Sequence, residues 1–460
     1  MNRLSIKILL LLIIVLLFVG VNCKDEPPVV PPEPPKKEIT LTLTDTTCTE
    51  AWITVRFANF IAPHYYKLYR DTTLAFAGTL FANETTFVDE GLLPKRAYTY
   101  KALRLENNIA KDSTTVIATT MDTTSHEFTF TVDTLGGYGS VLRDVAIIDE
   151  NNIWVVGEIY VKNTAGTVVD YNAARWDGMK WNLVQIPLRA TPSPNSSTYP
   201  VPLQTIIVFA SNEIYVSDGG QIVRYNGTNW GEWSHLFTDL YDTTFGGVNK
   251  LWGTSANDFW GVGNKGNIFH FNKTTWTKVS SPTTVNLKDI YGTPDGKQMW
   301  ACGYYSDKRG TYLLKKEGAA SWKIVYDGTT NRIFVRSDSI SGALSTVFVP
   351  TQNRVMVGTV SGLYLATNQT TGAAKRLSFT PDYFPGFPTR LRGNGINDVT
   401  LCGAFSFIGH YNGYSWRNYS ALRMEDGPLR SIAQKGNTIV AVGNLQDAID
   451  GKGLIIHGKR

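Results

Sequence analysis

Apolar and polar residues alternate along most of this chain, and the alternation predicts β-strands from residue 39 onward. Ile39–Leu43, Trp52–Phe57 and Tyr98–Leu105 place apolar side chains at about every second position, with turn-forming residues between the runs. A strand with this period presents one face to a core and the other face to water. Residues 38–121 are therefore predicted to form a small all-β sandwich.

From about residue 140 the strand pattern repeats. Each repeat has an apolar strand, a polar turn, an aromatic-apolar strand that ends at a small or polar residue, a third strand, and often an Asn-Gly or Asp-Gly turn followed by Trp. The strand-ending position recurs at Gly157, Asp218, Gly263, Gly303, Gly358, Gly403 and Gly443. Repeats of about 40–50 residues with four strands each are typical of a β-propeller. Residues 126–460 are therefore predicted to form a propeller of seven blades.

The last repeat is one strand short, because the sequence stops soon after the strand predicted at Gly453–His457. His126–Val132, which precedes the first repeat, alternates like a strand. We expect it to supply the missing outer strand of the seventh blade, which would close the ring and remove an exposed sheet edge.

Two motifs resemble known families. Leu93–Tyr100 is similar to the tyrosine corner of fibronectin type III modules, and Trp52 falls where that family buries its tryptophan. Trp252–Gly263 reads W-G-T-S-A-N-D-F-W-G-V-G, and the whole chain resembles bacterial surface lipoproteins with W-G-x-S-x-N-D-x-W-x-V-G repeats. The resemblance implies an all-β fold class: a fibronectin III-like sandwich followed by a seven-bladed β-propeller closed by an N-terminal outer strand. It implies no catalytic residues.

The N-terminus predicts export and anchoring. Residues 1–22 combine Arg3 and Lys7 with an apolar run that is short for a membrane span, which indicates a signal peptide. Cys23 follows directly and resembles the lipidated residue of bacterial lipoproteins, although cleavage without a lipid is the alternative. Residues 23–37 are rich in proline and predict an extended stalk. The expected location is the bacterial cell envelope, as an outer membrane lipoprotein exposed at the surface, held to the membrane through the lipid alone.

Composition and motifs exclude several classes of function. Forty-four Lys and Arg residues against 39 Asp and Glu give a formal net charge of +5, too small to indicate a nucleic-acid partner. The four cysteines are too few for a disulfide scaffold. Gly261–Gly266 fits G-x-G-x-x-G, but the residues after it predict a strand and not the helix that a dinucleotide site needs. His270, His410 and His457 occupy the same position in three different repeats. Equivalent positions lie far apart around a ring of blades, so these histidines cannot share a metal ion. We expect no cofactor, no metal and no catalytic residue.

Loop length and charge indicate where a ligand would bind. Long connections fall on one end of the strands, including Glu158–Ala173 and Asn444–Lys452. At that end the first strands begin with Arg143, Gln204, Asn249, Lys288, Ser345, Arg392 and Arg430. The basic residues among them would suit an anionic group such as a carboxylate, phosphate or acidic sugar. The alternative is that they pair with Asp144, Asp289 and other neighbours. The candidate ligand-binding residues are Arg143, Lys288, Arg392, Arg430, Glu158, Tyr160 and Tyr304.

Three hypotheses follow for function. The preferred one is a non-catalytic, envelope-anchored binding or scaffold protein whose long-loop face recognises a protein or a glycan. The second is a carbohydrate-active enzyme, such as a glycosidase or a glycosyltransferase-like protein, that uses two carboxylates on that face. The third is an envelope assembly factor that docks protein partners.

Overall fold

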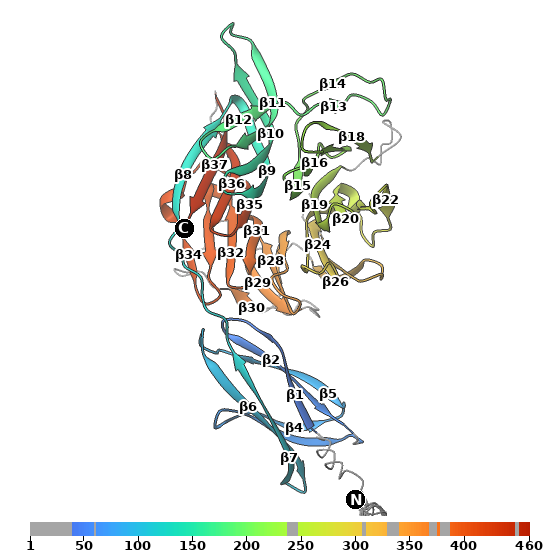
Figure 1. The fold of residues 1–460 in the computed structure, drawn as a ribbon, viewed down its shortest axis with the longest axis vertical. Helices are drawn as coiled ribbons and strands as arrows, with labels where there is room; N and C mark the ends of the chain where they lie inside the picture. The colour runs from blue at the N-terminus through green and yellow to red at the C-terminus, as the bar shows by residue number, and fades with distance from the viewer. Residues whose placement is uncertain are drawn as a thin grey trace, which may run out of the picture. The chain divides into compact units, whose positions relative to one another are not determined.

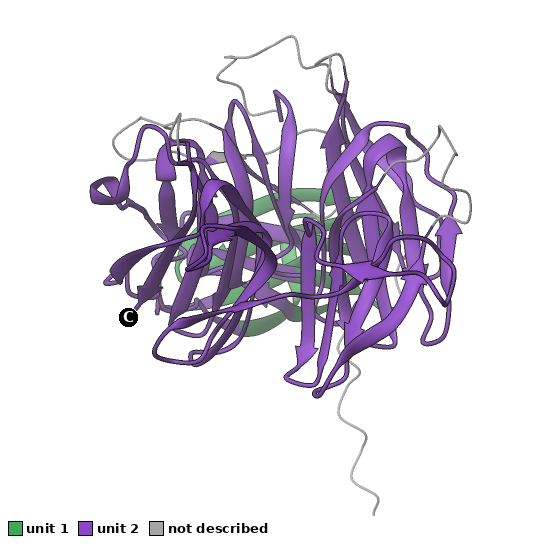
Figure 2. Cartoon of the chain, turned by 90° about the horizontal axis from the view of Figure 1, so that it is seen from above, with its two compact units in different colours: residues 1–42, 54–86, 100–116 green, residues 43–53, 87–99, 117–460 purple. Residues whose placement is uncertain are grey.

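The computed structural model describes residues 39–58, 61–236, 247–305, 310–328, 340–367, 375–377, 387–446 and 450–460. It divides into two compact units, residues 1–42, 54–86 and 100–116 in one and residues 43–53, 87–99 and 117–460 in the other (Figure 2). The predicted signal peptide, Cys23 and the predicted stalk lie outside the described residues. No helix in the described part of the chain is long and apolar enough to cross a membrane.

The first seven strands form two antiparallel sheets. One sheet has the order β1 (Ile39–Thr46), β2 (Glu50–Phe57), β5 (Glu84–Glu90), and the other has the order β4 (Thr73–Leu80), β3 (His64–Arg70), β6 (Ala97–Glu106), β7 (Ile109–Thr119). Trp52 is buried, and the Tyr98 hydroxyl accepts a hydrogen bond from the Leu93 backbone N–H at 2.9 Å. This contact has the form of a tyrosine corner.

Residues 129–460 form a β-propeller, so the predicted all-β propeller fold is confirmed (Figure 1). Its four-stranded sheets, called blades here, are numbered in chain order. Blade one is β9 (Gly137–Asp149), β10 (Asn152–Lys162), β11 (Val168–Trp176) and β12 (Trp181–Val184); blade two is β15 (Thr205–Ala210), β16 (Glu213–Ser217), β17 (Gln221–Tyr225) and β18 (Trp230–His235); blade three is β19 (Val248–Ser255), β20 (Asp258–Gly263), β21 (Ile268–Phe271) and β22 (Trp276–Val279). A short pair, β13 (Leu188–Arg189) and β14 (Thr198–Tyr199), lies between blades one and two.

The remaining blades repeat this order. Blade four is β23 (Asn286–Gly292), β24 (Gln298–Tyr304), β25 (Thr311–Glu317) and β26 (Lys323–Gly328); blade five is β27 (Leu344–Phe348), β28 (Arg354–Thr359), β29 (Gly362–Thr367) and β30 (Lys375–Leu377); blade six is β31 (Pro388–Gly395), β32 (Asp398–Gly403), β33 (Ile408–Tyr411) and β34 (Trp416–Asn418); blade seven is β35 (Leu429–Lys435), β36 (Thr438–Leu445), β37 (Lys452–Lys459) and β8 (Thr129–Leu135). Short 3-10 turns occur at η1 (Asn264–Gly266), η2 (Ala404–Ser406) and η3 (Ser420–Leu422).

The innermost strands of the blades contact one another in a ring. β9 contacts β15, each later first strand contacts the next, and β35 contacts β9. β8 pairs antiparallel with β37, from Gly453 opposite Leu135 to Lys459 opposite Thr129. Apolar clusters fill the spaces between neighbouring blades, for example Val155 with Val440 and Ile455. This ring places one end of every first strand around a common centre.

The glycine that recurs near the end of the second strand in six of the seven blades has a steric cause. The first strand makes an irregular step opposite this glycine, as between Val248 and Lys250 in blade three. A Cβ atom on Gly263 would lie 1.8 Å from the backbone oxygen of Gly247, and one on Gly157 would lie 2.1 Å from that of Val141. The glycine therefore lets the bulged backbone approach.

Candidate functional site: a cationic pocket at the channel mouth

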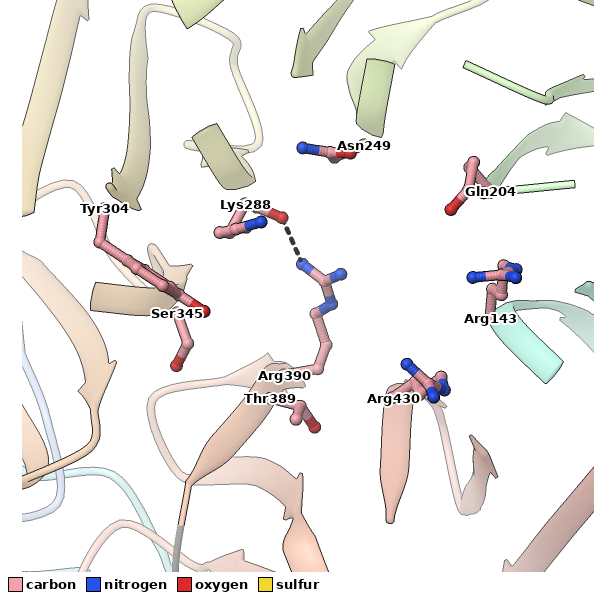
Figure 3. Close-up of a pocket in the computed structure, with 9 residues that line it drawn as sticks. All are labelled: Arg143, Gln204, Asn249, Lys288, Tyr304, Ser345, Thr389, Arg390 and Arg430. Atoms are coloured by element: carbon pink, nitrogen blue, oxygen red, sulfur yellow. Dashed lines mark hydrogen bonds between the residues drawn. The ribbon is translucent and has the colours of Figure 1, made fainter. Parts of the chain in front are cut away.

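The mouth of the central channel is a pocket of about 270 Å³. Its lining comes from the first strands of the blades and from the ends of second strands. Arg143, Gln204, Asn249, Lys288, Tyr304, Ser345, Thr389, Arg390 and Arg430 line it (Figure 3). Four of these nine side chains are cationic, and none is a carboxylate. The first strands thus converge four positive charges on one opening.

Two of the four cations have carboxylate partners just outside the lining. Arg143 donates to Glu158 at 2.6 Å, and Glu158 also accepts the Tyr160 hydroxyl at 3.1 Å. Arg390 lies 2.5 Å from Asp289. Glu158 and Tyr160, which were predicted to touch a ligand, do not line this pocket: Glu158 contacts Arg143, and Tyr160 contacts Glu158.

Lys288 and Arg430 have no carboxylate partner among the described residues. The Lys288 ammonium lies 5.5 Å from the centre of the Tyr304 ring, and burial lowers the pKa of Lys288. Arg430 donates to Asn444 at 3.1 Å; desolvation and the nearby Arg143 lower its pKa. No carboxylate lines the pocket, so its lining carries an excess of basic over acidic side chains. An anion there would gain charge-assisted hydrogen bonds.

Two buried carboxylates form a second layer below the mouth. Asp144 lies 2.5 Å from Lys250 and accepts hydrogen bonds from the Thr205 and Ser431 hydroxyls, which belong to three other blades. Asp289 plays the same part in blades four to six, where it binds Thr346, Arg390 and Arg392. These aspartates join the inner strands of different blades. The alternative prediction was that the basic residues at the mouth pair with them, but their partners are not the adjacent Arg143 and Lys288.

The structure corrects the prediction for Arg392. Sequence alignment of the repeats placed it at the mouth, but β31 shifts register between Pro388 and Arg390, so Thr389 holds that position. Arg392 lies deeper, with a side chain 12% exposed that binds Asp289 at 2.7 Å. Arg390, which sequence reasoning missed, lines the pocket instead, and its Nε–H has no hydrogen-bond acceptor among the described atoms.

The predicted long loop Glu158–Ala173 is also different in the structure. β10 continues to Lys162 and β11 begins at Val168, so this segment is a regular hairpin with a short turn. Tyr160 and Asp170 face each other across it. The extra length at this end of blade one is therefore ordered strand, which fixes Glu158 next to Arg143.

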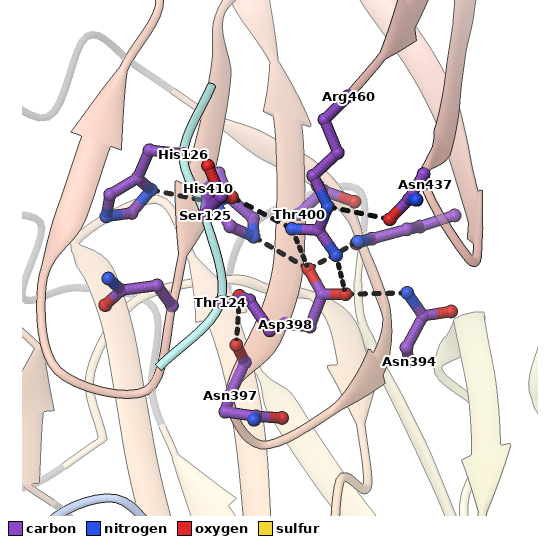
Figure 4. A network of polar contacts seen from close by, with 12 residues as sticks. Thr124, Ser125, His126, Asn394, Asn397, Asp398, Thr400, His410, Asn437 and Arg460 are labelled. Atoms are coloured by element: carbon purple, nitrogen blue, oxygen red, sulfur yellow. Dashed lines mark hydrogen bonds and ion pairs between the residues drawn. The ribbon is translucent and has the colours of Figure 1, made fainter. Parts of the chain in front are cut away.

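Two aspartates at the start of second strands bind histidines of the neighbouring third strands. Asp398 begins β32 and lies 2.8 Å from Nε2 of His410 on the third strand, where it also receives Arg460, Gln434 and Asn394 (Figure 4). Asp258 makes the same contact with His270 at 2.8 Å in blade three. Two of the three histidines at the shared repeat position, His270 and His410, are thus partners of aspartates, and the third, His457, packs edge-on against Trp176. No cluster of three or more potential metal ligands occurs in the described residues.

The blade-six network predicts a pH dependence. His126 lies 2.8 Å from His410, and burial together with His410 lowers the pKa of His126 to about 4. The unfolded chain takes up a proton at His126 below pH 6.5, while the folded chain resists it. We expect the free energy of unfolding to fall as pH drops from 6.5 to 4, with His126 contributing about 1 kcal/mol after allowance for its partial exposure.

Urea titrations across this pH range test the assignment. His126→Gln should make the free energy of unfolding depend less on pH, and the control Ser125→Ala should leave its pH dependence unchanged. An equal fall in both variants would contradict the assignment.

Comparison with known proteins adds likeness of fold only. A scan against protein-family models finds no match, and a search of curated proteins finds no similar sequence. Among solved structures, "YCF48 bound to D1 peptide" is 14% identical with a TM-score of 0.49, over 72% of this chain and 95% of that chain. The computationally designed Ika8 protein is 11% identical with a TM-score of 0.41, over 69% and 98% of the two chains.

Proposed function

We propose that this chain is a non-catalytic, envelope-anchored binding protein that holds an anionic group of a protein or glycan at the mouth of its propeller. In this proposal Cys23 carries the lipid, residues 23–37 form the stalk, and residues 38–121 form a fibronectin type III-like spacer. The seven blades, closed by β8, present the binding face. The observation that carries the proposal is the convergence of Arg143, Lys288, Arg390 and Arg430 on a pocket that contains no carboxylate.

The charge of the pocket favours binding over sugar hydrolysis. Glycosidases need two carboxyl groups facing one cavity. Glu158, which contacts the lining residue Arg143, is also bonded to Tyr160, and Asp289 is fully buried. Neither is arranged as a free general acid. The enzyme hypothesis therefore has no pair of groups in this pocket to perform it.

A glycan array that includes sialylated, sulfated and uronic-acid glycans tests the proposal. Lys288→Ala and Arg430→Ala remove the two cations without carboxylate partners, and each should weaken binding of acidic glycans about tenfold. The matched control is Lys278→Ala, which removes an exposed lysine from the outer strand β22. Equal loss in the control would indicate general electrostatic attraction. If the protein binds neutral glycans and neither variant weakens that binding, the proposal that the ligand binds at the channel mouth is wrong.

A further inference from the structure

Blades three and six contain the same aspartate–histidine pair in very different surroundings. In blade six the Asp398 side chain is 5% exposed, and the Arg460 guanidinium binds both of its oxygens, at 2.5 and 3.1 Å. Gln434 and Asn394 donate to it at 2.6 and 2.7 Å. In blade three the Asp258 side chain is 65% exposed. His270 is the one hydrogen-bonding partner that the described residues supply to this carboxylate.

Backbone register identifies the residue that stands in place of Arg460. The Arg460 N–H donates to the oxygen of Asn437, just before β36 begins. In blade four the Gly318 N–H donates to the oxygen of Lys297, just before β24 begins. Gly318 and Arg460 therefore occupy the same repeat position, each beside the aspartate of the preceding blade. A Cβ atom on Gly318 would meet no atom within 4 Å, so the space that a side chain would enter is open.

The other two donors are also replaced. The β31 and β19 registers place Thr254 at the position of Asn394, and the β35 and β23 registers place Gly292 at that of Gln434. What blade three has instead is aromatic surface. The Trp260 ring stacks on His270, with centroids 4.0 Å apart, and Trp252 lies beside it in the same lining.

These replacements leave a pocket of about 300 Å³ at the end of the blades opposite the channel mouth. Trp252, Thr254, Asp258, Trp260, His270 and Met299 contribute to its lining. One cation is already present, because Lys316 also lines the pocket. Its ammonium donates to the backbone oxygens of Gly318 and Ala320, however, and it has no hydrogen bond with Asp258. The second oxygen of Asp258 remains available.

We propose that this blade-three pocket binds the arginine side chain of a partner protein. Arg460 at Asp398 shows how the fold seats a guanidinium on this aspartate, and blade three repeats the acceptor without the internal arginine. The planar guanidinium would pair with Asp258 and stack on the indole of Trp252, because His270 and the Lys316 ammonium already lie against the Trp260 ring. An aromatic face beside a carboxylate favours arginine over lysine. This site takes a cation and is independent of the anion pocket at the mouth.

Binding of N-acetyl-L-arginine N-methylamide to purified protein labelled with 5-fluorotryptophan tests the proposal. Fluorine NMR resolves individual tryptophans, and Trp252→Phe and Trp260→Phe assign the two pocket signals. We expect arginine to shift these two signals selectively, and the neutral isostere N-acetyl-citrulline N-methylamide to leave them unshifted at the same concentration. Asp258→Asn should weaken the arginine response about tenfold, because it removes the charge but keeps the shape.

Glu425→Gln is the matched control, because Glu425 is an exposed carboxylate elsewhere and its removal should leave the response unchanged. If Asp258→Asn does not fold, the comparison of arginine with citrulline on the unmodified protein decides alone. Equal shifts by arginine and citrulline would overturn the proposal, as would shifts spread over tryptophans outside the pocket. No shift at 20 mM ligand, about twentyfold above a dissociation constant of 1 mM, would overturn it as well.

Discussion

Replacing Asp289 with asparagine is expected to lower the free energy of unfolding by about 3–5 kcal/mol, because it leaves two buried arginines without their carboxylate partner. Asp289 is fully buried, and Arg390 and Arg392 lie within 2.7 Å of it with side chains 10% and 12% exposed. Its carboxylate also accepts the Thr346 hydroxyl and the Val347 N–H of the next blade. The neutral asparagine amide does not balance the charge of either guanidinium group, and both groups stay in a poorly solvated part of the channel.

Urea unfolding at pH 7 and pH 5 measures this effect. Burial acts to raise the pKa of Asp289, but Arg390 and Arg392 outweigh it and hold the pKa at about 2. The stability that this carboxylate supplies is therefore complete above pH 3.8 and is lost only as pH falls toward 2. The deficit of the variant should be equal at the two pH values. Asp327→Asn, at an exposed position, should change stability by less than about 0.5 kcal/mol. A small loss at Asp289 as well would show that the aspartate does not hold the ring together.

Replacing Lys250 with methionine should also destabilise the protein by about 3–5 kcal/mol at pH 7, and here the loss should shrink in acid. Lys250 is buried, and burial lowers its pKa to about 8 despite the attraction of Asp144, so it is mainly charged at neutral pH. Methionine leaves Asp144 with hydrogen bonds from Thr205, Ile206 and Ser431 but without the ammonium that lies 2.5 Å from it.

The pH dependence of the stability deficit distinguishes Lys250→Met from Asp289→Asn, whose deficit should be the same at pH 7 and pH 5. Without Lys250, burial should raise the pKa of Asp144 above 3.8 in the folded state. The folded variant then takes up a proton that the unfolded chain does not, so its deficit should narrow as pH falls from 7 to 4. Chemical denaturation across this range measures the deficit. A deficit that stays constant would mean that Asp144 keeps its charge through its hydrogen bonds alone.

Alternation and repetition in the sequence were sufficient to predict the propeller. The glycine near the end of six second strands and the Trp that begins the outer strand of blades one, two, three and six correspond to elements of the structure. The strand predicted at His126–Val132 corresponds to β8, which runs from Thr129 to Leu135. The closing strand was predictable because a four-strand repeat that stops one strand short leaves an edge, and β8 pairs with that edge. These inferences depend on local periodicity, which the chain carries in plain form.

The polar partners could not be predicted in the same way. The register shift between Pro388 and Arg390 puts Thr389 at the position that was predicted for Arg392, and such a bulge leaves no mark in the alternation. The ion pairs of Asp144 with Lys250 and of Asp398 with Arg460 form only because the ring brings together strands that are distant in the sequence. Which charges at the mouth remain unpaired therefore becomes visible only in three dimensions. Sequence reasoning located the basic rim, and the structure identified Lys288 and Arg430 as its unneutralised members.

Crystals of the protein soaked in selenate provide the most direct test that the channel mouth binds anions. Selenium gives an anomalous signal that locates a tetrahedral dianion without prior assumption about its position. The proposed function predicts an anomalous peak among Lys288, Arg390 and Arg430 that disappears in crystals of the Lys288→Ala, Arg430→Ala double variant. An empty mouth with peaks elsewhere, or a mouth peak that persists in the double variant, would contradict it.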